Sequence, residues 1–223
     1  MSRSRATGGG VPLFVGLAGR RVVGVGGGRV AAAKLLPLAE AGAEVVVVAP
    51  HVQPELVASA VVHRRPYFGP QDLAGAFLVV AATADAQVNA RVAADAEALA
   101  TFCVRVDRDT DATAPGSAAL AAAVRHGPLT IAVSTGGQAP SLARWLRAEL
   151  EEAYGPEYGQ LAALLGELRR DARVRRHLAS LDSEGRRAAW RAIPLPDILR
   201  LIRKGSPLDA RELALACLSS SSD

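Results

Sequence analysis

The chain has 223 residues, of which half are hydrophobic but only 4% aromatic, and its formal net charge is +4. This apolar content excludes a disordered chain, and no run approaches the roughly 20 apolar residues that span a bilayer. The two cysteines, Cys103 and Cys217, lack CxxC spacing, and the four histidines share no metal-ligand spacing. We therefore expect a cytoplasmic protein without disulfides, a resident metal or membrane contact.

The first half of the chain alternates short apolar strands with helices. After a flexible tail over 1–10, we expect strands over 21–25, 44–49, 61–64, 77–82 and 102–106. Helices are expected over 29–41 and 85–100, with a helical turn at 71–73. Pro37 should kink the first helix or shift its register, and Gly42 should close it. This alternation predicts an α/β fold, with a parallel sheet covered on both faces.

The pattern changes after Asp107. A polar loop to residue 116 leads to an Ala-rich segment, a strand over 129–134 and a tight loop at Thr135-Gly136-Gly137. Beyond Pro140 only helices are expected, with breaks at 155–156, near 183, at 194–196 and at 205–207. Many arginines lie in this part, which fits solvated helix faces, a polyanionic small substrate or a nucleic acid.

The glycine-rich turn after the first strand is the strongest local motif. Gly26, Gly28 and Ala31 fit the pattern G-x-G-x-x-G/A between a strand and a helix. The first glycine permits the tight turn, the second lets the backbone approach a pyrophosphate, and the small third residue lets helix and strand pack. The pyrophosphate would rest on the helix N-terminus. The motif predicts a dinucleotide site, with a purely structural turn as the alternative.

Other candidates follow later strands. The second strand ends at Pro50-His51 without the acid that usually binds the ribose, so backbone groups or His51 would hold it, or the cofactor differs. Asp107 ends a strand at the carboxyl edge, where its carboxylate could exchange a proton. The loop at Thr135 could be a second anion-binding helix start. A surface histidine, a capping aspartate and a plain turn are the respective alternatives.

Several separate segments resemble the siroheme synthase N-terminal-type precorrin-2 dehydrogenase and sirohydrochlorin ferrochelatase family. In chain order they are Val11–Phe14, Gly19–Val23, the glycine turn with Val30, Ala31 and Lys34, Glu40–Val45, Val47–Pro50, Val80–Thr83, Val88-Asn89, Val106-Asp107, Ile131–Gly137, Pro140, Leu142–Arg144 and Leu146-Arg147. The resemblance covers residues 11 to about 150, and the helical remainder matches in length and character only.

The resemblance implies an NAD-dependent enzyme that oxidises the tetrapyrrole precorrin-2 to sirohydrochlorin, with ferrous iron as a further substrate in some members. It implies a homodimer with a Rossmann-type NAD-binding domain (11–112), a dimerisation region (113–150) and a helical C-terminal domain (151–223). Asp107 stands at the position of the family's catalytic aspartate, and Thr135 and Gly136 stand in the family's substrate-binding loop. The residues in the places of its NAD contacts are Gly26, Gly27, Gly28, Arg29, Val30, Pro50, His51 and Thr83.

The sequence departs from the family pattern in three places. Val104 and Arg105 stand where the family usually has Asn before its aspartate, the stretch 111–115 lacks the usual aromatic residue, and Pro37 replaces an ordinary helix residue. Two alternatives stay open, namely an NAD-dependent dehydrogenase of another substrate and a non-enzymatic NAD-sensing or nucleic-acid-binding protein. No helix-turn-helix signature or set of stacking aromatics favours nucleic acid as a partner.

Overall fold

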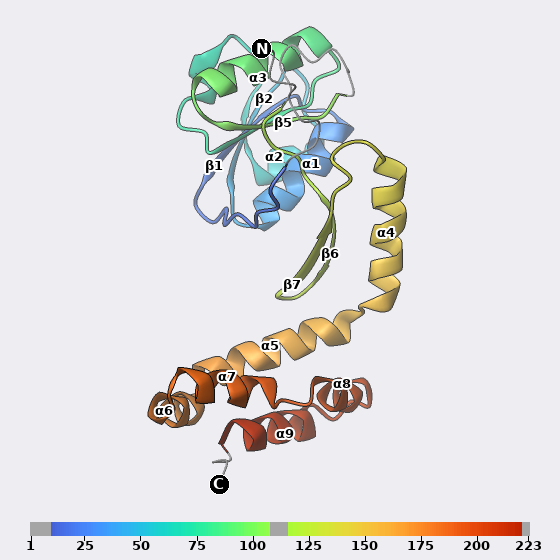
Figure 1. Ribbon diagram of the computed structural model, residues 1–223. Helices are drawn as coiled ribbons and strands as arrows, with labels where there is room; N and C mark the ends of the chain where they lie inside the picture. Colours follow the sequence, from blue (N-terminus) through green and yellow to red (C-terminus); the bar gives the residue numbers. More distant parts are fainter. Residues whose placement is uncertain (1–9, 108–115, 220–223) are drawn as a thin grey trace, which may run out of the picture. The chain divides into compact units, whose positions relative to one another are not determined.

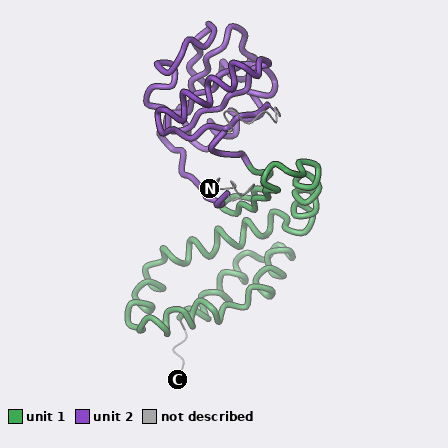
Figure 2. The backbone as a smooth tube through the Cα atoms, turned by 45° about the horizontal axis from the view of Figure 1, so that its top comes forward, with its two compact units in different colours: residues 1–9, 121–223 green, residues 10–120 purple. Residues whose placement is uncertain are grey.

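The computed structural model describes residues 10–107 and 116–219, and the chain divides into two compact units. We call Gly10–Leu120 the sheet unit and the residues from Ala121 onward the helical unit (Figure 2). Residues 1–9 of the predicted tail and the predicted domain boundary at 112–113 lie outside the described residues. No helix in the described ranges is long and apolar enough to cross a bilayer.

The sheet unit contains a parallel sheet with the strand order β3-β2-β1-β4-β5 (Figure 1). In chain order its elements are β1 (Arg21–Val25), α1 (Arg29–Glu40), β2 (Glu44–Val48), α2 (Pro54–Ser59), β3 (Val61–His63), the 3-10 helix η1 (Pro70–Leu73), β4 (Leu78–Ala81), α3 (Ala86–Ala98) and β5 (Phe102–Arg105). The predicted α/β fold with a parallel sheet is confirmed. The analysis did not predict α2, whose six residues are too few to show a helical period.

Both faces of this sheet are buried, as the runs of valine predict. Because side chains alternate along a strand, β1 places Val22 against the helices α1 and α2, and Val23 against α3 and η1. The two apolar clusters include Leu35 from α1 on one face and Val92 from α3 on the other. The sheet is thus packed between two helical layers, which fixes the strand ends from which the loops begin.

Helix α1 packs unusually close to β1. A Cβ at Gly24 would lie 2.3 Å from Leu35 Cδ1, and Ala31 is fully buried. The predicted role of Ala31 in close helix–strand packing is therefore confirmed. The helix continues through Pro37 to Glu40, and Gly42 adopts a φ of +86° just beyond its end.

The helical unit begins with an antiparallel hairpin of β6 (Ala122–His126) and β7 (Leu129–Val133). The sequence predicted β7 but only an Ala-rich segment in place of β6. Within the described residues six helices follow, namely α4 (Pro140–Ala153), α5 (Pro156–Arg170), α6 (Ala172–Ser180), α7 (Ser183–Arg191), α8 (Leu195–Arg203) and α9 (Pro207–Ser219). The break between α5 and α6 was not predicted, and there the carboxylate of Asp171 caps α6 by accepting from the amides of Arg173 and Val174.

Candidate functional site

The carboxyl ends of the parallel strands meet at one edge of the sheet. The chain leaves β1 at Gly26, β2 at Ala49, β4 at Ala82 and β5 at Val106. The strand order places β1 and β4 side by side although they are not consecutive, so the crossovers change direction between them. Open α/β sheets bind ligands in the crevice at such a switch point. The structure therefore gathers the predicted residues after β1, β2, β4 and β5 at the edge where a ligand is expected.

The first two glycines of the turn are required by their neighbours. Gly26 has a φ of +115°, and a Cβ there would lie 2.4 Å from the carbonyl oxygen of Ala82. A Cβ at Gly27 would lie 2.3 Å from the carbonyl oxygen of His51. Any side chain at either position would collide with backbone, which cannot move as a flexible side chain can. These contacts lock the turn to the ends of both neighbouring strands.

The third glycine faces open space. Gly28 is the N-cap of α1, its φ is −77°, and a Cβ there would meet no atom within 4 Å. No side chain in the described ranges caps this helix, and its first recorded amide bond runs from Ala32 to the Gly28 carbonyl. The amides of the first turn therefore point out of the helix start without helical acceptors. Exposed amides beside unfilled space are what the diphosphate of a dinucleotide requires, so the residues present fit that group.

The loop after β2 is tied to the glycine turn by its backbone. The amide of Gln53 donates to the Gly27 carbonyl at 2.8 Å, while Pro50 and His51 are exposed. Arg29 and Val30 are also exposed, at the start of α1. These four predicted cofactor residues thus border the same turn with accessible side chains. No Asp or Glu stands at the end of β2, as the sequence shows.

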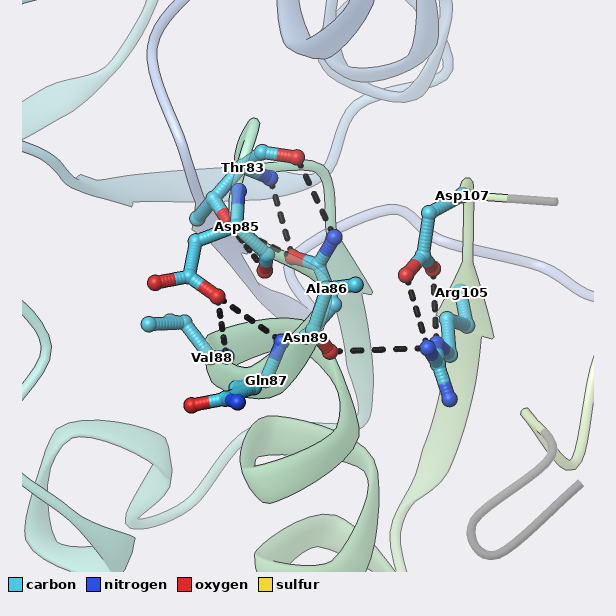
Figure 3. A network of polar contacts seen from close by, with 8 residues as sticks. All are labelled: Thr83, Asp85, Ala86, Gln87, Val88, Asn89, Arg105 and Asp107. Carbon is cyan, nitrogen blue, oxygen red and sulfur yellow. Dashed lines mark hydrogen bonds and ion pairs between the residues drawn. The ribbon is translucent and has the colours of Figure 1, made fainter. Parts of the chain in front are cut away.

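Thr83 begins a polar network around the buried Asn89 after β4 (Figure 3). Its amide and hydroxyl donate to Asn89 Oδ1 at 3.0 and 2.8 Å, and Asn89 Nδ2 donates back to the Thr83 carbonyl at 3.1 Å. Asn89 is fully buried, and Asp85 caps α3 by accepting from the amide of Gln87 at 2.8 Å. Asn89 therefore holds Thr83 in place. Asn89 is part of the sequence resemblance, which gave it no role.

Asp107 lies beyond the end of β5, where Arg105 grips its carboxylate (Figure 3). Arg105 Nε donates to Oδ1 at 2.6 Å and Nη2 donates to Oδ2 at 2.7 Å. The side chains of Arg105 and Asp107 are only 8% and 18% exposed. This bidentate pair, with a smaller contribution from Asn89, lowers the pKa of Asp107 below its ordinary value. The carboxylate is therefore ionised near neutral pH and can act as a proton acceptor.

Arg105 is a candidate functional residue that in the sequence is only a departure from the family pattern. Besides gripping Asp107, its Nη2 lies 3.4 Å from the Ala86 carbonyl at the start of α3. It thereby joins the ends of β5 and α3 (Figure 3). A basic residue two positions before a candidate catalytic acid was the signal that could have revealed this pair.

Thr135 and Gly136 belong to the helical unit, in the loop between β7 and α4. Thr135 Oγ1 accepts from the amide of Ala139 at 3.2 Å, and Ser134 Oγ accepts from the amide of Gly136 at 3.2 Å. Gly136 and Gly137 have φ values of +61° and +81°. The loop is thus a well-defined turn at the start of α4, and its predicted role in substrate binding stays a prediction.

Comparisons with known proteins agree with this geometry. Residues 13–115 match a family model described as NAD(P)-binding, and residues 126–153 match one described as the central part of sirohaem biosynthesis proteins. A siroheme synthase of Pseudomonas putida (strain W619) is 45% identical over 190 residues, which cover 82% of this chain and 39% of the relative. A siroheme synthase of Ectopseudomonas mendocina is 40% identical over 205 residues, with 91% and 43% covered.

One solved structure gives the fold of nearly the whole chain. The protein named SirC, precorrin-2 dehydrogenase, superposes with a TM-score of 0.65 at 24% identity, covering 94% of this chain and all of the other. The chain spans about two fifths of the length of the siroheme synthases that it matches. Both family models match in order and the identity reaches 45%, so the chain is similar in sequence to the siroheme synthases whose family its motifs resemble.

Proposed function

We propose that this chain is an NAD-dependent dehydrogenase that oxidises precorrin-2 to sirohydrochlorin in siroheme biosynthesis. The observation that carries the proposal is the ionised carboxylate of Asp107 on the same sheet edge as a glycine turn open to a diphosphate. The names of the relatives, siroheme synthase and precorrin-2 dehydrogenase, supply the substrate class.

The glycine turn and the first turn of α1 would hold the cofactor. Backbone amides after Gly28 would bind the diphosphate, and Pro50 and His51 would border the adenosine half. NAD+ supplies the acceptor for a hydride. Thr83, held by Asn89, would keep the end of β4 in a fixed position beside the turn, so that the cofactor meets a preformed surface.

Asp107 would remove the proton that the oxidation releases. Desaturating a carbon–nitrogen or carbon–carbon bond takes one hydride and one proton from the substrate. Once the hydride has left, the substrate carries positive charge and its proton is strongly acidic, so a carboxylate of low pKa suffices as the base. The same negative charge stabilises the cation as it forms. Arg105 positions both carboxylate oxygens throughout.

The test is turnover by the purified chain with precorrin-2 and NAD+ in the absence of oxygen. We expect NADH and sirohydrochlorin to appear in equal amounts, measured by their absorbance. A chain that binds NAD+ in calorimetry but forms no sirohydrochlorin would contradict the proposal. Normal NADH formation with a different reduced substrate would favour a dehydrogenase of another specificity. Ferrous iron as a further substrate stays a prediction of the resemblance.

We also propose that the chain forms a homodimer through its helical unit. Helix α4 buries none of its residues in the single chain, although Leu142 and Trp145 are 45% and 57% exposed. An amphipathic helix with an uncovered apolar face usually packs against a partner. Light scattering should give twice the chain mass for the wild type and the single-chain mass for Trp145→Arg. A single-chain mass for the wild type at micromolar concentration would exclude this dimer.

A further inference from the structure

An arginine-rich pocket lies within the helical unit and takes no part in the proposed reaction. It has a volume of about 580 Å³ and is lined by Arg169, Ser183, Arg186, Arg187, Trp190 and Arg191. Arg169 comes from α5 and the others from α7. The volume is within the range of small-molecule sites.

Helix α7 places these side chains by its period. Arg187 and Arg191 are four residues apart, so they share a face, and Ser183 lies one turn earlier. The helix start is fixed because Asp182 Oδ1 accepts from the amide of Gly185 at 2.7 Å. Ser183, Arg186, Arg187 and Arg191 are all exposed, so a ligand can reach them.

The charge of the pocket is unbalanced. Among the described residues, Glu184 is the carboxylate that pairs with its arginines, contacting Arg187 at 3.8 Å and also Arg191. These partners are 64–73% exposed, and such exposed pairs contribute little to stability. Four arginines thus line the pocket, of which Arg187 and Arg191 pair with Glu184 and Arg186 donates to the Leu181 carbonyl, and a multivalent anion could replace the exposed carboxylate at small cost.

The wall of the pocket is aromatic. The guanidinium of Arg169 lies 4.9 Å from the ring centre of Trp190, and Trp190 also packs against the apolar core of the unit. A partly buried indole beside several guanidinium groups offers apolar contact and paired hydrogen bonds together. Inorganic phosphate would use only the arginines, whereas a planar ring with acidic substituents would use the whole pocket.

We propose that this pocket binds the carboxylate-bearing edge of a tetrapyrrole, an identification of the ligand that rests on the proposed function. The guanidinium groups would donate paired hydrogen bonds to the carboxylates, and Trp190 would contact the edge of the macrocycle. Such a site would hold substrate or product on the helical unit. Its members come from two helices and include no residue assigned above to the reaction.

Trp190 itself reports on binding. Trp145 and Trp190 are the two tryptophans of the chain, so Trp145→Phe leaves Trp190 as the single emitter. We would titrate this chain with uroporphyrin, a stable tetrapyrrole with paired carboxylates on every pyrrole, and with coproporphyrin and ATP. Saturable quenching by uroporphyrin, weaker with coproporphyrin and weakest with ATP, is expected. Equally tight binding of ATP would overturn the choice of a carboxylate macrocycle.

Two variants of equal charge separate the pocket from general electrostatics. Arg186→Gln with Arg187→Gln should weaken uroporphyrin binding by about tenfold or more. Arg175→Gln with Arg176→Gln removes the same charge from exposed positions of α6 outside the pocket and should have little effect. Equal weakening by both pairs, or no saturable quenching, would overturn the proposal.

A third variant predicts a change in the opposite direction. Glu184→Gln releases Arg187 and Arg191 and should tighten uroporphyrin binding. This test therefore holds even if the double variant of Arg186 and Arg187 fails to fold normally. Weaker binding by Glu184→Gln would contradict the proposal. Turnover of precorrin-2 on the same samples keeps the two hypotheses apart. Turnover without quenching would exclude the pocket alone, and arginine-dependent quenching without turnover would exclude the dehydrogenase alone.

Discussion

The two units of this chain present their chemistry in different ways. In the sheet unit the candidate site is built largely from backbone, because Gly26 and Gly27 sit against carbonyl oxygens and Gly28 leaves amides accessible. In the helical unit, α4 and α7 bury none of their residues and present side chains to their surroundings. A rigid parallel sheet can hold loops in place for chemistry, whereas loosely covered helices are suited to contacts with partners and ligands.

The largest expected effect concerns the sheet unit, where Asp107 is the candidate proton acceptor. Asp107→Asn removes the proton acceptor while keeping a similar shape, so turnover of precorrin-2 should fall by about 10²–10⁴-fold. NAD+ affinity measured by calorimetry should stay the same, because the glycine turn is unchanged. Asp209→Asn on the exposed side of α9 is the control and should keep full activity. Full turnover by Asp107→Asn would remove Asp107 from the mechanism.

The glycine turn offers a matched pair of substitutions. Gly26→Ala forces a Cβ to within 2.4 Å of backbone at a φ of +115°, so it should lower the free energy of unfolding by about 1–3 kcal/mol or more. Gly28→Ala meets no atom and should lower it by about 1 kcal/mol at most, through the N-cap. Its Cβ would instead enter the space of the diphosphate and weaken NAD+ binding by about tenfold or more.

These two measurements need one chemical denaturation series and one calorimetric titration. If Gly28→Ala bound NAD+ as tightly as the wild type, the diphosphate would not lie against that residue. If Gly26→Ala were as stable as the wild type, the turn would be more adaptable than its contacts indicate.

An ion pair of the sheet unit with a buried carboxylate can be compared with an exposed pair of the helical unit. Arg65 donates to both oxygens of Asp72 at 2.9 and 2.6 Å, and the Asp72 side chain is 2% exposed. Asp72→Asn should therefore lower the free energy of unfolding by about 1–3 kcal/mol. Asp197 pairs with Arg200 at 2.8 Å but is 48% exposed, so Asp197→Asn should change it by about 0–1 kcal/mol.

The effect of Asp72→Asn should depend on pH. The hydrogen bonds from Arg65 lower the pKa of Asp72 in the folded chain, so the folded state binds its proton more weakly than the unfolded state. The stabilisation is complete above the ordinary carboxyl pKa of about 4 and is lost as the pH falls through the lower folded value. Denaturation of both chains at several pH values should show their difference shrinking in acid. A constant difference would contradict this origin.

The sequence predicted the sheet unit better than the helical unit, for a physical reason. Runs of valine and the spacing of Gly26, Gly28 and Ala31 are local signals, so the parallel sheet and the open turn could be predicted. The grip of Arg105 on Asp107 depends on side-chain direction, which spacing alone does not give. The pocket at Trp190 joins Arg169 to a helix far along the chain, and such a meeting has no local signal.

The smallest expected effect tests the hydrogen bonds from Arg105 to the Asp107 carboxylate. Arg105→Gln keeps a hydrogen-bond donor but removes the charge that holds the Asp107 carboxylate ionised, so the pKa of Asp107 should rise. Turnover needs the ionised form, so the acid limb of the profile of kcat/KM against pH should move to higher pH. A structural role alone would lower the rate at every pH without moving that limb. An unmoved limb would therefore assign Arg105 to the shape of the sheet edge and leave Asp107 to act without it.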